Sequence, residues 1–324
     1  MFIFIGGSKN NNGVIQTVQG PVGSDTLGVT LSHEHLFSNF GLPINETSTY
    51  DETRLLAQVI PYLTMLHSQG VRTIFDYTAS HFGRRADLLK AISDSTGISI
   101  VTNTGIYGAA DDRHIPKYAY DASAMELARR WITEANNGID GTSILPGFIK
   151  LAFDQGPPSQ IDRKLFEAGL LTHLETGLTI AVHTGDNPDA VHLQLDLLNK
   201  YGVHPSAWIW THANLHDDFE LLFEVADHGA WISMDGVNHE NIEQYLEYIQ
   251  RFKDADLLDR LLLSHDGNGY PAGGDIRPFE AIPKELIPSM RSHGFSESVI
   301  DQLLVKNAGE AYAIRVRRTG EREN

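Results

Sequence analysis

Short apolar runs alternate with longer amphipathic stretches along almost the whole chain. The apolar runs predict β-strands near residues 29–34, 72–77, 98–104, 146–151, 178–183, 207–211, 230–235 and 261–265. The stretches between them carry apolar residues at helical spacing and predict helices over residues 54–70, 86–97, 124–138, 163–177, 190–202, 218–229 and 241–252. Several of these stretches end in glycine, as the C-terminal ends of helices often do.

Strands that alternate with helices in this way predict an α/β fold of the (β/α)8 TIM barrel type. The alternative is an open doubly wound sheet, but no glycine-rich phosphate fingerprint follows the first strand. Residues 14–28 predict a short N-terminal β-hairpin with its turn near Gly23, Ser24 and Asp25. Residues 267–295 predict a long Gly- and Pro-rich loop, followed by a helix, that would contact substrate. No linker interrupts the pattern, so residues 1–324 are expected to form a single domain.

Metal-binding side chains follow several of the predicted strands. His33 and His35 lie two residues apart in VTLSHEHLF, and residues i and i+2 of a strand share one face. Glu34 between them should point the opposite way. In an isolated His-x-His pair, a chance occurrence is about as probable as a metal site.

Three more strand ends change this balance. His183 ends TIAVH, His212 ends WIWTH, and Asp266 follows LLLSH. A lone histidine at a strand end is more often a hydrogen-bonded core residue, but an aspartate there needs a partner or a metal ion. Because the strand ends of a parallel barrel converge, these side chains predict a catalytic metal site at its mouth. His265 should face away from this site.

Lys150 lies inside the apolar segment GFIKLAF, where an unpaired ammonium group would be costly. It could pair with an acidic residue, or form a Schiff base as in barrel aldolases. As a third alternative, CO₂ could carboxylate its amine. The resulting anionic carbamate would bridge two metal ions, whereas a cationic lysine would repel them.

Net charge and composition exclude several kinds of binding partner and site, and the opening segment bears on the cellular location. The formal net charge is −17, which argues against nucleic acid or an anionic membrane as a partner. The chain has no cysteine, so disulfides, thiolate metal sites and a cysteine nucleophile are excluded. The opening MFIFIGG is too short for a signal peptide or a membrane span, which gives a cytoplasmic location as the expectation. The sequence is compatible with a homodimer but does not fix the oligomeric state.

With these residues at its strand ends, the sequence resembles the phosphotriesterase-like branch of the amidohydrolase superfamily. The resemblance starts at Ile15-Gln16-Thr17-Val18-Gln19, followed by GPV, LG and LSHEH, and it covers roughly residues 14–314. It implies a (β/α)8 barrel with two divalent metal ions, usually zinc. The more buried ion would be held by His33, His35 and Asp266. The exposed ion would be held by His183 and His212, with carboxylated Lys150 (N6-carboxylysine) and a hydroxide bridging the two.

The resemblance also has departures and further candidate residues. Family lactonases often carry an arginine after the aspartate that ends the seventh strand, whereas Asp235 is followed by Gly236. Tyr107 is kept at the third strand end, where it lines the site in family lactonases. In the 267–295 loop, Tyr270 and Arg277 could contact substrate, although a surface salt bridge is an equal alternative for Arg277. Asp235 could orient Asp266, bind substrate or serve as a helix N-cap.

Together with these residues, the resemblance implies a metal-dependent hydrolase that acts on ester bonds of small molecules, and the preference for a lactone follows from the family. The bridging hydroxide would attack a lactone or ester carbonyl, and Asp266 would accept the proton. Phosphotriester hydrolysis is expected as a side activity or, alternatively, as the main activity. A Lys150 Schiff-base aldolase and a non-catalytic metal-binding barrel are the remaining alternatives.

Overall fold

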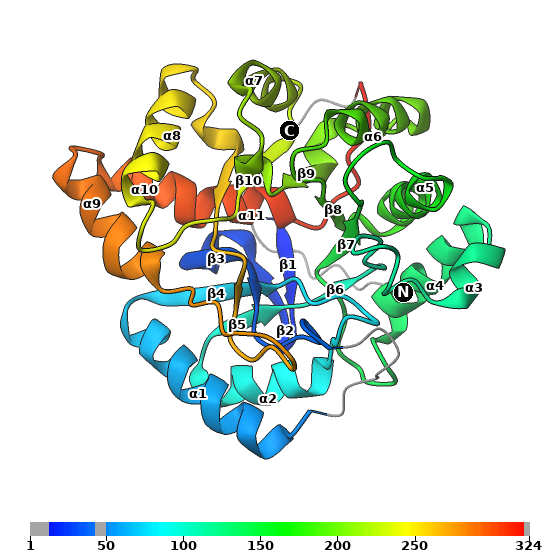
Figure 1. Cartoon of the computed structure of the whole chain (residues 1–324), viewed down its shortest axis with the longest axis horizontal. Helices are drawn as coiled ribbons and strands as arrows, with labels where there is room; N and C mark the ends of the chain where they lie inside the picture. Colours follow the sequence, from blue (N-terminus) through cyan, green and yellow to red (C-terminus); the bar gives the residue numbers. More distant parts are fainter. Residues whose placement is uncertain (1–12, 43–49, 321–324) are drawn as a thin grey trace, which may run out of the picture.

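A ring of parallel strands forms the centre of the molecule in the computed structural model, which describes residues 13–42 and 50–320 (Figure 1). The strands of the ring are β3 (Val29–His35), β4 (Val71–Asp76), β5 (Ser99–Val101), β6 (Asn103–Thr104), β7 (Phe148–Ala152), β8 (Thr179–His183), β9 (Trp208–Thr211), β10 (Trp231–Met234), β11 (Leu261–Leu263) and β12 (Gly267–Asn268). They pair in the orders β12-β3-β4-β5 and β11-β10-β9-β8-β7-β6. Because β5 and β6 are separated only by Thr102, and β11 and β12 by residues 264–266, the two sheets make up eight strand positions.

Hydrogen bonds between the first and last strand positions close the ring. The hydroxyl of Ser32 on β3 donates to the carbonyl oxygen of Leu263 on β11 at 3.2 Å. The amide of His33 donates to Ser264 Oγ at 2.9 Å, and the amide of Asp266 donates to the carbonyl oxygen of His33 at 3.2 Å. The eight predicted strands and the predicted (β/α)8 barrel are therefore confirmed.

Long helices surround the strands (Figure 1). They are α1 (Glu52–Ser68), α2 (Ala86–Thr96), α4 (Ala124–Asn137), α5 (Gln160–Thr176), α6 (Pro188–Tyr201), α7 (Phe219–Asp227) and α8 (Ile242–Asp254), each close to its predicted range. Side chains of Asp51, Ser123, Ser159, Asn187 and Asp218 accept hydrogen bonds at the N-terminal ends of five of them. Glycine in the left-handed conformation follows α2, α5 and α6, which explains why the glycine signal located these helix ends.

Shorter helices complete the chain. They are the α-helices α3 (Lys117–Asp121), α9 (Ile287–Ser292), α10 (Glu297–Asp301) and α11 (Asn307–Tyr312), the 3₁₀ helices η1 (Ser24–Thr26), η2 (Pro205–Ala207), η3 (Ala213–Leu215) and η4 (Leu258–Arg260), and the π-helical turns η5 (Ile282–Leu286) and η6 (Gln302–Lys306). The loop predicted over residues 267–295 is thus shorter than expected, because η5 and α9 make residues 282–292 helical.

Side chains alternate between two cores, as strand geometry requires. A cluster that includes Phe75, Tyr77, Phe148 and Tyr312 fills the inside of the barrel. A larger cluster fills the layer between strands and helices. Lys150 has the register of Phe148, two residues earlier on β7, so the apolar face of this strand carries the lysine into the barrel.

The N-terminal hairpin is present, but its predicted turn is wrong. Strands β1 (Val14–Thr17) and β2 (Gly20–Gly23) pair with Thr17 opposite Gly20, so the turn lies at residues 18–19. Gly20 has φ of 127°, and the amide of Gln19 donates to Thr17 Oγ1 at 3.1 Å. The Gly-Ser-Asp sequence instead begins η1. Ile15 of the hairpin joins the interior core.

No helix among the described residues is long and apolar enough to cross a membrane. The opening segment, from which we argued the cytoplasmic location, lies outside the described residues.

Candidate metal centre

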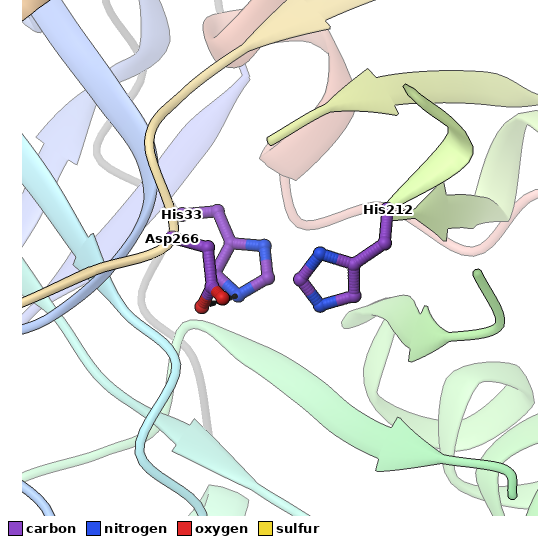
Figure 2. A group of neighbouring side chains, drawn as sticks. All are labelled: His33, His212 and Asp266. Carbon is purple, nitrogen blue, oxygen red and sulfur yellow. Dashed lines mark ion pairs between the residues drawn. The ribbon is translucent and has the colours of Figure 1, made fainter. Parts of the chain in front are cut away.

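Three of the predicted ligands form a compact group at the C-terminal ends of the barrel strands. His33 comes from β3, His212 follows β9, and Asp266 lies between β11 and β12. One ligand atom from each of the three lies within 4.8 Å of the others. Figure 2 shows the two imidazoles and the carboxylate facing a common point from opposite sides of the barrel. This is the end of a (β/α)8 barrel at which active sites are found.

His35 and His183 extend this group on either side. His35 Nε2 lies 3.2 Å from Asp266 Oδ1, and the rings of His33 and His35 have centroids 5.7 Å apart. The rings of His183 and His212 are closer, with centroids 4.4 Å apart. The structure thus brings together all four histidines that the strand-end pattern singled out.

Lys150 completes the set from inside the barrel. Its side chain is 1% exposed, and within the described residues its Nζ atom has no hydrogen-bond partner. Burial lowers the pKa of Lys150 to about 7, against the opposing influence of Asp235 and Asp266. A large fraction of the amine is therefore neutral near physiological pH. A neutral amine with a lone pair is the form that can react with CO₂.

The backbone turns sharply at two of the ligand positions. His212 has φ of 59° and Asp266 has φ of 52°, both in the left-handed region that residues other than glycine rarely adopt. At both positions the chain leaves a strand and aims a side chain across the barrel mouth. Strained backbone of this kind is typical of functional sites.

Two polar residues hold the imidazoles in place. Asp235 Oδ2 accepts a hydrogen bond from the amide of His212 at 2.7 Å and lies 3.1 Å from Nδ1 of His33. The Asp235 side chain has 0% exposure, so it supports the cluster from within the barrel. Asp235 is not an N-cap, because the N-cap of α8 is Asn241. Thr78 donates its hydroxyl proton to Phe37 O and so accepts from Nδ1 of His35, at 2.9 Å in each case. This arrangement leaves Nε2 of His35 facing Asp266.

The electrostatic state of the group suits metal binding. Burial holds the pKa values of His33 and His183 well below their usual range and lowers that of His212 to about 4. These imidazoles are therefore neutral and can offer a lone pair. Burial alone would raise the pKa of Asp266, but the contact with His35 and the neighbouring imidazoles hold it well below its usual range. The carboxylate is therefore ionised.

Arg277 is paired with a candidate ligand and is not a remote surface residue. Its Nη1 donates to Asp266 Oδ2 at 2.8 Å, and its side chain is 43% exposed. Two backbone hydrogen bonds between Asn268 and Arg277, at 2.7 and 3.0 Å, fix its position beside the mouth. Of the two alternatives for Arg277, the structure shows an ion pair, and part of the guanidinium remains exposed beside the mouth.

The two tyrosines differ in their distance from the group. Tyr107 Oη lies 3.5 Å from Nδ1 of His183, so its hydroxyl faces the site. The ring of Tyr270 instead contacts Tyr50, with centroids 6.5 Å apart, and packs against the outer core. The structure therefore brings Tyr107, but not Tyr270, into contact with the histidines.

The two residues expected to face away do so. Glu34 Oε1 accepts from Ser264 Oγ at 2.7 Å and lies 2.6 Å from Nδ1 of His265. Nε2 of His265 accepts from the amide of Ile282 at 3.0 Å. This network ties β3 to the β11–β12 segment and to η5, beside the candidate ligands.

Sequence reasoning missed Tyr77 and Thr78, which contact His33 and His35. The ring of Tyr77 stacks on the imidazole of His33, with centroids 3.7 Å apart and an interplanar angle of 17°. Both residues follow β4 directly, so they are at a strand end like the ligands. That position was the available signal, but neither residue type is a usual metal ligand.

The residues present fit a pair of divalent ions. Four imidazoles, three of them neutral by burial, and one ionised carboxylate are donors that zinc and similar ions accept. The amine of Lys150 has no hydrogen-bond partner among the described residues. It could join the metal ligands only after reaction with a further group such as CO₂. The arrangement defines a (β/α)8 barrel with a candidate metal site at the mouth of the barrel.

Comparison with known proteins identifies the family. The model described as "Phosphotriesterase family" matches residues 13–312, and the chain therefore belongs to this family. It is 29% identical over 296 residues to the phosphotriesterase homology protein of Escherichia coli K12, covering 89% of this chain and 99% of the relative. It is 26% identical over 301 residues to an aryldialkylphosphatase of Saccharolobus solfataricus, covering 88% and 94%.

Other relatives and solved structures agree with this assignment. An N-acetyltaurine hydrolase of Mus musculus is 26% identical over 351 residues, covering 91% of this chain and 97% of the relative. The organophosphorus hydrolase of Deinococcus radiodurans superposes with a TM-score of 0.84 at 26% identity, covering 94% of this chain and all of that one (100%). The relatives are hydrolases, so the expectation that the chain is an enzyme of this class, acting on small molecules, is confirmed.

Proposed function

We propose that the protein hydrolyses a lactone or a related carboxylic ester with the help of two divalent metal ions. The observation that carries this proposal is the convergence of neutral histidines, an ionised Asp266 and the unpartnered Lys150 amine at the barrel mouth. A solved structure from work on "Molecular Engineering of Organophosphate Hydrolysis Activity from a Weak Promiscuous Lactonase Template" is 26% identical, with a TM-score of 0.83. This description supports a lactone as the first substrate class to test.

The proposed ion-binding residues are His33, His35, Lys150, His183, His212 and Asp266. Zinc is the preferred ion because the set is rich in imidazole. When bound, two such ions supply an activated water and polarise the scissile carbonyl. For Lys150 to contribute, its neutral amine adds to CO₂, forming an N–C bond and releasing one proton. The resulting carbamate would offset the charge of the cations.

The remaining roles belong to residues at the mouth. Asp266 Oδ1 faces the imidazoles and would accept the proton of the attacking water and return it to the leaving group. Arg277 on Oδ2 would keep this carboxylate ionised and oriented. Tyr107 would donate a hydrogen bond to the substrate. Tyr270 would contribute only by packing within the loop that lines the substrate site. Asp235, which is fully buried, would orient His33 and His212 and not touch the substrate.

A phosphotriester as the main substrate is the second candidate. The relatives named aryldialkylphosphatase and organophosphorus hydrolase favour it. A Schiff-base aldolase is disfavoured, because a substrate carbon would have to reach an Nζ atom on a side chain that is 1% exposed. We also propose that the chain forms a single domain. A measurement of the mass of the protein in solution would test whether it forms a homodimer.

The decisive experiment is a substrate panel run on protein reconstituted with zinc. The panel contains lactones, aryl esters, phosphotriesters and N-acyl amides, and kcat/KM is measured for each. We expect the highest value for a lactone and loss of turnover after chelation. A higher value for a phosphotriester would establish the second candidate. Borohydride trapping of substrate on Lys150 would support an aldolase, and two bound ions without any turnover would support a binding protein.

A further inference from the structure

One aromatic ring contacts two of the proposed ligands at once. The ring of Tyr77 stacks on His33, with centroids 3.7 Å apart and planes at 17°. The Nζ atom of Lys150 lies over the same ring, 4.6 Å from its centroid. His33 comes from β3 and Lys150 from β7, so Tyr77, directly after β4, connects side chains from separate strands.

Tyr77 is itself held firmly. Its side chain is completely buried, at 0% exposure. Its hydroxyl pairs with the hydroxyl of Tyr312 on α11, which also donates to the carbonyl oxygen of Ser32 at 3.1 Å. The ring also packs against Phe148, with centroids 4.8 Å apart and planes tilted by 42°. The ring thus has one position, fixed from β3, β7 and the C-terminal helix.

The stacking of Tyr77 on His33 should stabilise one form of the imidazole more than another. The face of a tyrosine ring carries partial negative charge and attracts electron-poor partners. An imidazole whose nitrogen donates to a divalent cation becomes electron-poor, so it stacks more strongly on the ring than free imidazole does. The ring therefore favours the metal-bound form of His33 over the free form. It also blocks rotation of the imidazole, which Asp235 touches at Nδ1 at 3.1 Å.

We propose that Tyr77 is a positioning residue of the metal centre, a platform that sets the plane of His33. This inference rests on the proposed function, because it assumes that His33 holds a metal ion. It adds a determinant of metal affinity that touches neither the metal nor the substrate. The hydroxyl serves only to anchor the ring, so the aromatic face is the part that matters.

The test compares substitutions at Tyr77 with one at a matched position. Tyr77→Phe keeps the ring, whereas Tyr77→Leu and the longer, more flexible Tyr77→Met remove it. The control is Phe75→Leu, two residues earlier on the same face of β4, whose ring stacks on Tyr312 with centroids 3.9 Å apart. Each purified variant is titrated with zinc against a chelating dye, and metal content and thermal unfolding are measured alongside.

We expect Tyr77→Phe to bind zinc within a factor of about three of wild type. Loss of the ring should weaken zinc binding about 10- to 100-fold, as is usual when a group that orients a ligand is removed. Phe75→Leu should lower thermal stability without this loss of affinity. Wild-type affinity in Tyr77→Leu or Tyr77→Met, or an equal loss in Phe75→Leu, would overturn the platform role alone. Wild-type protein that takes up no divalent ion would overturn the proposed function and this inference with it.

Discussion

The surroundings of the Lys150 side chain indicate which chemical form its amine takes. Its amine lies inside the barrel on an otherwise apolar strand face, and among the described residues no hydrogen-bond acceptor reaches it. An ammonium ion in that place would be costly to bury. Carboxylation converts the group into an anion beside several nitrogen ligands, which is favourable once cations are bound.

Replacing Lys150 therefore tests the bridge directly. We expect Lys150→Ala to lose most bound metal, because the site loses the group that offsets the charge of two cations. A short-chain carboxylic acid should restore part of the metal content and activity by supplying a carboxylate in the same space. Elemental analysis of the purified variant measures the effect, with Lys200→Ala on the surface as control. Unchanged metal content in Lys150→Ala would contradict the bridge.

The proton-transfer role of Asp266 can be separated from its role as a ligand. Asp266→Asn keeps one oxygen that can face the metal site, but it loses the second acceptor that binds Arg277 and cannot accept a proton. We expect kcat to fall about 10²- to 10⁴-fold, the usual contribution of general acid–base catalysis. At least one metal ion per chain should remain. A variant with full kcat would show that another group moves the proton.

At this scale the sequence located the candidate ligands but not their supports. His33, His183 and His212 could be found because each ends an apolar run, and strand ends converge. Tyr77 looks from the sequence like one more aromatic of the core, which it also is. Its stacking on His33 depends on the distance between neighbouring strands, which no local pattern encodes.

At the scale of elements, β6 and β7 approach each other closely beside Lys150. Gly105, directly after β6, has φ of 111°, and a Cβ atom there would lie 2.2 Å from the carbonyl oxygen of Lys150. Only glycine meets both conditions. The position of Lys150 therefore depends on the absence of a side chain on the neighbouring strand.

A methyl group at this position should disturb both stability and the site. We expect Gly105→Ala to destabilise the fold by roughly 3 kcal/mol, from backbone strain and the clash together. Metal content should also fall, because β7 must move. Chemical denaturation and metal analysis measure the two effects. The control is Gly156→Ala, where φ is 88° and nothing lies within 4 Å, so it carries backbone strain without a clash. Equal effects in both variants would contradict the argument.

The long elements were predictable and the short ones were not. Periodicity and glycine caps placed the helices from α1 to α8, except α3, because each buries one continuous face. The hairpin turn was misplaced because Thr17 and Gln19 form the turn through a hydroxyl contact, while Gly23-Ser24-Asp25 carries the stronger turn composition. The helix from residue 282 was hidden by two prolines, Pro283 and Pro288, which lie in its first turns.

At the scale of the whole molecule, a buried histidine joins the C-terminal segment to the barrel. His173 on α5 donates from Nδ1 to the carbonyl oxygen of Leu178 and accepts at Nε2 from the amide of Arg317, at 2.9 Å in each case. Burial lowers the pKa of His173 to about 4. Since Nε2 must accept, the folded protein holds this ring neutral.

This histidine should make stability depend on pH. An exposed histidine in the unfolded chain has a pKa of about 6.5, so between that pH and about 4 the unfolded chain binds a proton that the folded protein does not. Stability should thus fall by roughly 3 kcal/mol as the pH drops through this window. Denaturant unfolding at several pH values measures the slope. His173→Gln should flatten it, whereas a change at the exposed His192 should not. An unchanged slope in His173→Gln would assign the effect elsewhere.

The seam of the barrel lies at the candidate metal centre. The amide of Asp266 donates to the carbonyl oxygen of His33 where the last strand meets the first, and the side chains of the same two residues lie 3.4 Å apart. An ion shared by them would act as a clasp between the two ends of the sheet. Metal binding at this centre should then stabilise the closed barrel against opening. Hydrolytic activity and the closure of the barrel would therefore depend on the same ion.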